Sequence, residues 1–134
     1  MAGSLDAEIK LVYPVDDGTF FTVDSIPSGT PFDVIANVEI GDATNQNVDA
    51  HDLWVSVRNL SKSTTLAGQR FSEKLAAEKN RKRRLELRVD FDDPWTADDG
   101  DILEVVASYR VIAGANSIVS VARSLPFVVS SEVF

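Results

Sequence analysis

The chain has 134 residues, of which 44% are hydrophobic and 25% are charged, as in folded globular proteins. Its formal net charge of −8 argues against non-specific binding to nucleic acid or to an anionic membrane surface. There is no cysteine, which excludes disulfides, thiolate metal sites and thiol catalysis. The single histidine, His51, excludes a histidine-rich metal centre. The length predicts one domain over residues 1–134, large enough for a two-layer core.

The N-terminal residues carry no visible targeting signal. Met1 to Glu8 contain neither a basic region nor an apolar run, so the sequence predicts no signal peptide. No stretch of the chain approaches the ~20 apolar residues that a membrane-spanning helix needs. Because the absence of cysteine suits a reducing compartment, we expect a cytoplasmic location.

The first half of the chain alternates between extended segments and turns. Clusters of proline, glycine and aspartate predict turns at residues 14–18 and 26–31. Residues 20–23 between them are predicted to be extended, and the polar residues 41–52 predict a long loop. Apolar and polar residues alternate in the segments between them, which predicts half-buried strands. These strands cover residues 8–13, 32–40, 53–60 and, more weakly at a sheet edge, 64–71.

The second half adds one helix and three strands. Residues 72–79 predict a two-turn helix capped by Ser72, which would need tertiary support. Strands follow over 82–91, 101–112 and 117–129, with a hairpin turn at 113–116. Pro126 lies inside the last strand, so it must fall at an edge, a bulge or a switch between sheets.

Strict alternation of charged and apolar residues from Arg84 to Phe91 places Leu85, Leu87 and Val89 on one buried face. The same period of two assigns one face of the other strong strands to the core. The predicted core contains Val34, Val38, Val55, Val57, Leu85, Leu87, Val89, Leu103, Val105 and Ala107.

Seven or eight strands with turns between them predict an all-β fold, an antiparallel β-sandwich of immunoglobulin-like or fibronectin-like type. A jelly roll or small β-barrel is the alternative. Gly29-Thr30-Pro31-Phe32 resembles the start of the second strand in immunoglobulin-like domains. The segment from Asp98 to Leu103 resembles the acidic-glycine corner before their sixth strand. The missing cysteine pair excludes an antibody-type domain.

The residues that catalysis requires are scarce. His51 precedes a strand and is predicted to lie in a loop, and no Gly-x-Ser-x-Gly motif or glycine-rich phosphate loop is present. The sequence therefore predicts no enzymatic activity and no cofactor, with a small enzyme of unknown type as the third alternative.

An acidic segment offers ligands for calcium. Carboxylates are hard oxygen ligands, and residues 90–94 resemble a cadherin-type calcium linker. The alternative is a solvated loop whose aspartates serve turns and caps. The calcium candidates are Asp90, Asp92, Asp93, Asp98, Asp99 and Asp101.

Two features predict contacts with a partner. Trp54 lies on the outward face of its strand, where a loop, the Phe20–Phe21 segment or another molecule would cover it; Trp95 is expected to plug the end of the sandwich. Five basic residues fall within six positions, which indicates an acidic partner or a solvated junction that pairs with acidic loops. They are Lys79, Arg81, Lys82, Arg83 and Arg84.

These observations favour a non-enzymatic interaction or assembly module that binds a protein partner or a second copy of itself. Self-association would join the basic and acidic ends of neighbouring molecules, or bury an apolar interface at Trp54. The alternative is an accessory module that binds carbohydrate or calcium. We expect neither membrane nor nucleic-acid binding.

Overall fold

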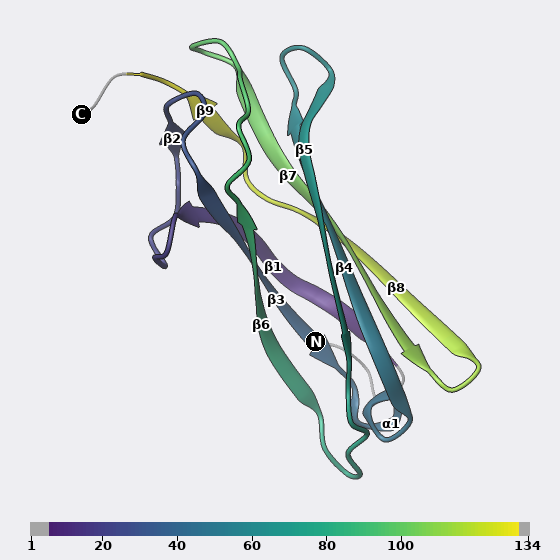
Figure 1. Ribbon diagram of the computed structural model, residues 1–134. Coiled ribbons are helices and arrows are strands. Elements are labelled where there is room, and N and C mark those ends of the chain that lie inside the picture. The colour runs from purple at the N-terminus through teal and green to yellow at the C-terminus, as the bar shows by residue number, and fades with distance from the viewer. Residues whose placement is uncertain (1–5, 132–134) are drawn as a thin grey trace.

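The computed structural model describes residues 6–131, which form two packed β-sheets (Figure 1). The smaller sheet has the order β1-β3-β6. The larger sheet has the order β2-β9-β7-β4-β5, and β8 also pairs with β7. The smaller sheet comprises β1 (Ala7–Asp16), β3 (Phe32–Ile40) and β6 (Arg83–Phe91). The larger comprises β2 (Ser25–Ile26), β4 (Val48–Asn59), β5 (Thr64–Lys74), β7 (Ile102–Ala113), β8 (Asn116–Arg123) and β9 (Phe127–Val129).

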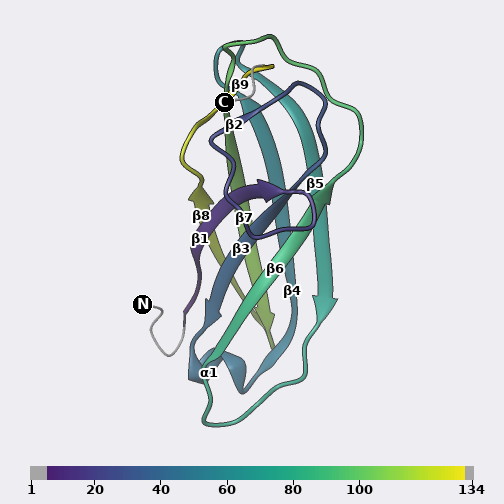
Figure 2. The same ribbon diagram turned by 90° about the vertical axis from the view of Figure 1, so that its left-hand side faces the viewer.

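The predicted antiparallel, immunoglobulin-like β-sandwich is confirmed. Every strand pair is antiparallel except the short β2–β9 pair. Among the described strands, the chain crosses between the sheets after β1, β2, β3, β5 and β6, as in Greek-key sandwiches (Figure 2). β9 pairs with the start of β7 and β8 with the rest of it, so both lie along one edge of β7.

The core lies between the two sheets, on the faces that the alternation predicts. Nine of the ten predicted core residues are buried, and Leu85 is partly buried against them. Aromatic rings close one end of the core. Phe32 stacks on Phe91 at 5.3 Å between ring centroids and meets Trp95 and Phe127 edge to face. Trp95 donates its Nε1–H to the Thr30 carbonyl at 3.0 Å, so it plugs the end of the sandwich as expected.

Three predicted elements are wrong or need revision. The helix over 72–79 does not form, because β5 continues to Lys74, which pairs with Ala50 in β4. The loop over 41–52 instead contains the four-residue helix α1 (Asp42–Asn45) and the start of β4. The strand over 117–129 is divided at Pro126 into β8 and β9.

Within residues 6–131, no helix is both long enough and apolar enough to cross a bilayer. The prediction that no signal peptide is present concerns Met1 to Glu8. Residues 1–5 of this segment lie outside the described residues, so it stays a prediction.

Candidate functional site

The basic residues 79–84 lie at the end of the sandwich near α1, and carboxylates of the same molecule pair with them (Figure 1). Glu78 pairs with Arg83 at 2.7 Å and with Arg81 at 3.2 Å. Glu39 pairs with Lys82 at 3.2 Å and with Arg84 at 3.6 Å. Although burial opposes it, hydrogen bonding to Lys82 lowers the pKa of Glu39. These pairs neutralise much of the basic segment within the molecule.

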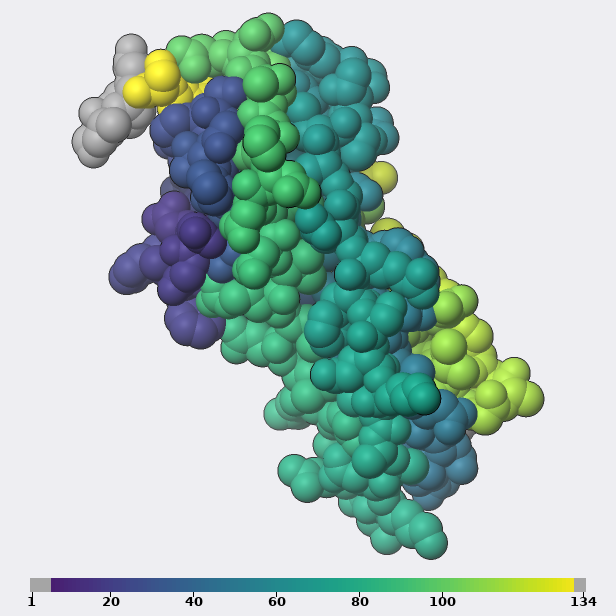
Figure 3. All heavy atoms as spheres, viewed as in Figure 1, coloured from purple at the N-terminus to yellow at the C-terminus, as the bar shows by residue number. Residues whose placement is uncertain are grey.

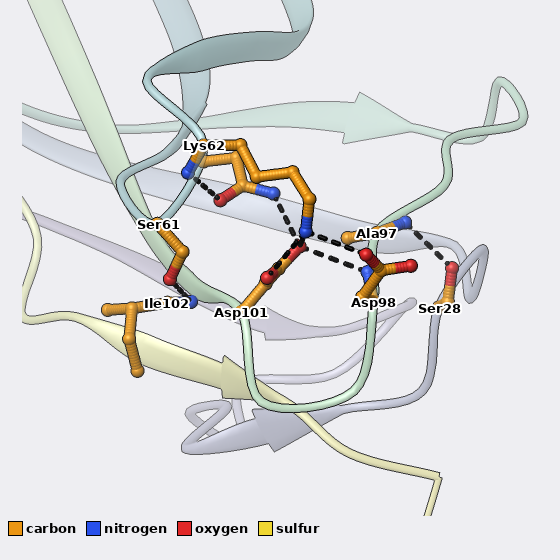
Figure 4. Close-up of polar contacts among 8 residues, drawn as sticks. Ser28, Ser61, Lys62, Ala97, Asp98, Asp101 and Ile102 are labelled. Atoms are coloured by element: carbon orange, nitrogen blue, oxygen red, sulfur yellow. Dashed lines mark hydrogen bonds and ion pairs between the residues drawn. The ribbon is translucent and has the colours of Figure 1, made fainter.

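The corner before β7 holds half of the predicted calcium candidates, and a lysine lies among them (Figure 4). Lys62, from the β4–β5 turn, pairs with Asp101 at 2.9 Å and with Asp98 at 2.7 Å. Asp101 also accepts hydrogen bonds from the Asn59 side chain at 2.8 Å and from the Asp98 N–H at 3.0 Å. Hydrogen bonding to Asn59, and then to Lys62, lowers the pKa of Asp101. Lys62 thus joins the β4–β5 turn to the corner before β7, and the Ser131 hydroxyl donates to the Asp99 carboxylate at 2.8 Å.

The remaining candidates lie elsewhere. Asp90, the next-to-last residue of β6, lies opposite Asp33 in β3. Asp92 lies close to Asp33 and Asp17, while Asp93 is exposed. The structure therefore divides the acidic segment into two groups with different neighbours. Asp17 and Asp33 were missed in the sequence because they come from segments far from residue 90.

Trp54 lies on the outer face of β4 and is half-buried. Two guanidinium groups cover it: Arg70 lies 4.6 Å and Arg110 5.3 Å from the ring centroid. Asp52 holds both arginines, at 3.3 Å and 2.6 Å. The prediction that the Phe20–Phe21 segment covers Trp54 is wrong. Phe20 instead packs against Arg88, whose guanidinium carbon lies 4.8 Å from the centroid of the Phe20 ring.

Replacing Asp52 with asparagine is expected to lower stability at neutral pH more than in acid. Hydrogen bonding to Ser72, and then to Arg110 and Arg70, lowers the pKa of the buried Asp52 carboxyl below its ordinary 3.8. A depressed carboxyl pKa stabilises the fold above about pH 4, and this stabilisation disappears as the pH falls through the folded-state value. Urea midpoints measured at several pH values should therefore converge for the two proteins in acid. The exposed Asp93→Asn should show no such pattern.

The prediction that His51 lies in a loop is wrong. His51 lies in β4 and is fully buried, with its Nδ1 2.7 Å from the Tyr109 hydroxyl and its Nε2 3.0 Å from Glu73. Burial raises the pKa of Tyr109, which is also fully buried. Both rings are closed to solvent, and both nitrogens of His51 have hydrogen-bond partners, so His51 and Tyr109 form a buried polar pair that belongs to the core.

β8 forms an edge of the larger sheet and exposes apolar side chains. Among the described residues it pairs with β7 and with no strand on its other side. Ile118 and Ala122 pack against the core, whereas Val119 and Val121 between them are 59% and 64% exposed. Figure 3 shows the green-to-yellow β7–β8 hairpin projecting at the lower right of the molecule.

The apolar surface continues from β8 towards β1. The two strands lie side by side (Figure 2), and the Ile9 N–H of β1 donates to the Ser120 hydroxyl of β8 at 3.2 Å. A groove of about 400 Å³ lies between β1 and the segment that follows β8. Leu11 and Leu125 line it and are 60% and 85% exposed.

The other long edge strands carry features that block edge-to-edge pairing. β1 has a register shift between Ile9 and Leu11 and contains Pro14. β5 and β6 expose charged side chains, namely Arg70, Glu73, Lys74, Arg84, Glu86 and Asp90. From Asn116 to Ala122, β8 has no charged residue, proline or glycine, so among the described edge strands its sequence has the fewest features that block pairing.

No protein-family model and no curated protein matches the sequence. Among solved structures, the chain is similar to the crystal structure of the C-terminal domain of Wzt, with a TM-score of 0.59 and 11% identity. That similarity covers 98% of this chain and 76% of that one. A putative β-galactosidase from Bacteroides fragilis gives a TM-score of 0.49 and 14% identity over 90% of this chain, which spans 17% of that enzyme. The similarity to the Wzt domain extends over nearly the whole chain and shows a shared β-sandwich fold.

Proposed function

We propose that this domain is a non-enzymatic assembly module that pairs with a second copy of itself through β8. The observation that carries the proposal is the edge of β8, which pairs with β7 alone among the described strands and carries the exposed Val119 and Val121. Such an edge is a template for another strand. Exposed apolar side chains beside it gain free energy when a partner removes them from water.

A second copy is the occupant that the charges favour. Each chain carries a net charge of −8, so two copies repel each other over most of their surfaces. β8 is uncharged from Asn116 to Ala122, so two copies can approach there at low electrostatic cost. An antiparallel pair centred on Ser120 would place Val119 opposite Val121 of the partner subunit. The same patch would then serve both subunits, as a twofold interface requires.

The two interfaces predicted from the sequence have weaker support. Head-to-tail pairing would need free charges on the basic segment, but Glu39 and Glu78 of the same chain already pair with it. An interface or sugar site at Trp54 would have to displace Arg70 and Arg110 from the indole. We therefore place the assembly surface at β8.

Val121→Lys is expected to convert a concentration-dependent dimer into a monomer. A lysine at this position would lie opposite Val119 of the partner subunit, with the second lysine diagonally across the twofold axis, and would replace apolar contacts with charges. Sedimentation equilibrium over a range of concentrations measures the change. Because the pairing is apolar and through the backbone, the dimer of the unsubstituted chain should persist as salt rises.

Leu60→Lys is the matched control, since Leu60 is also an exposed apolar residue but lies beyond the end of β4. It should leave the dimer intact. A protein that is monomeric at all concentrations would contradict self-association. A dimer that survives Val121→Lys but dissociates in salt would contradict the β8 interface and favour pairing through charged ends.

A further inference from the structure

Three aspartates from separate segments meet at one end of the smaller sheet. Asp17 lies in the turn after β1, Asp33 lies in β3, and Asp92 directly follows β6. β3 pairs with both of its neighbours, so that Asp33 lies opposite Val15 on one side and Asp90 on the other. One carboxylate oxygen from each of Asp17, Asp33 and Asp92 lies within 4.8 Å of the other two.

The Asp33 carboxylate is the buried member of this group, with 1% of the residue exposed. Its Oδ2 accepts hydrogen bonds from the Gly18 N–H at 3.0 Å and from Arg88 at 2.6 Å. Its Oδ1 is buried and has no donor among the described residues. The carboxyl groups of Asp17 and Asp90 contact Asp33, but an ionised carboxylate has no proton to donate. A buried oxygen without a donor is costly, and a cation is a ligand that would satisfy it.

The charges around this oxygen do not balance. Like charges directly opposite each other on antiparallel strands, as at Asp33 and Asp90, destabilise the pair. Among the described residues, Arg88 is the one cation that forms an ion pair with this group. Burial, and then repulsion from Asp33, raises the pKa of Asp17, while contact with Asp33 raises the pKa of Asp90. Carboxylates that lie close together raise one another's pKa, so both shifts agree with the crowding seen here.

We propose that Asp17, Asp33 and Asp92 bind a calcium ion. Calcium takes roughly six to eight oxygen ligands in flexible geometry, so carboxylates from two loops and a strand suit it, and backbone carbonyls and water can complete the shell. Zinc sites in proteins are built mainly on histidine or cysteine ligands; this chain has no cysteine, and its one histidine is buried in the other sheet. The site shares Asp92 with the segment predicted from the sequence but replaces the corner at Asp98 with Asp17 and Asp33.

Bound calcium would join the turn after β1 and the end of β6 to β3. The test is a calorimetric titration of chelator-treated, metal-free protein with calcium chloride, together with melting temperatures in millimolar calcium. We expect one ion per chain and a higher melting temperature. Asp17→Asn and Asp92→Asn should each weaken binding by about tenfold or more. Without calcium, both variants should be at least as stable as the unsubstituted chain, because each removes a repelling charge.

Asp98→Asn is the matched control, because Asp98 is an exposed aspartate that pairs with Lys62 at the separate corner. It should bind calcium as the unsubstituted chain does. We avoid substituting Asp33, since it also holds Gly18 and Arg88. The absence of both binding heat and a melting shift in millimolar calcium would overturn the proposal. An equal shift with magnesium chloride, or an undiminished response in Asp17→Asn and Asp92→Asn, would instead indicate general screening of the negative charge.

Discussion

Phe32→Ala is expected to lower the free energy of unfolding by about 3–5 kcal/mol, because it opens a cavity that several rigid rings cannot fill. Phe32 is 2% exposed and lies at the centre of the aromatic cluster, in contact with Phe91, Trp95 and Phe127. Native domains have free energies of unfolding of about 5–15 kcal/mol, so this one substitution would remove a large part of the stability of the fold.

Urea denaturation followed by tryptophan fluorescence measures the effect, since Trp95 packs directly against Phe32. Phe21→Ala is the matched control, because it makes the same truncation at a residue that is 73% exposed, and it should change stability by no more than about 0.5 kcal/mol. A similar small change for Phe32→Ala would show that the aromatic cluster contributes little to the fold.

The sandwich could be predicted because most strands bury one face and expose the other. β3 begins and ends at the predicted residues 32 and 40, and the buried side chains of β6 and β7 follow the predicted alternation. This pattern depends on local sequence alone, since a period of two matches the pleat of a strand.

The errors arise where tertiary contacts override local preference. Residues 72–79 contain alanine, glutamate and lysine, which favour a helix, but pairing with β4 extends β5 into this segment. The start of β4 was missed for a related reason. His51 is polar and lies on the buried face, so the apolar alternation that identifies a strand is interrupted there.

The candidate sites could be predicted only in part, because their residues come together across strands. Asp92 lies in an acidic segment and is therefore a candidate from the sequence. The alternation of the strand over 32–40, in contrast, assigns Asp33 to the outward face as an ordinary polar residue. Only the register of β3 against β1 and β6 brings the two together. Likewise, the β8 edge is identified because β8 pairs with β7 alone among the described strands, which sequence alternation does not reveal.

Tyr109→Phe is expected to lower the free energy of unfolding by about 1–3 kcal/mol, the cost of leaving a buried polar atom without its partner. Glu73 can only accept a hydrogen bond, so His51 donates from Nε2, and its Nδ1 accepts from the Tyr109 hydroxyl. The phenylalanine ring fills nearly the same space but leaves this nitrogen without a donor inside the core.

A double-mutant cycle separates this coupling from a loss of packing. In the Tyr109→Phe background, His51→Leu removes the unpaired nitrogen, so the double variant should lose less stability than the sum of the two single changes. The half-buried Tyr13→Phe makes the same change at the chain's other tyrosine and should have a small effect. Simple additivity would contradict the coupling, because each residue would then contribute independently of the hydrogen bond between them.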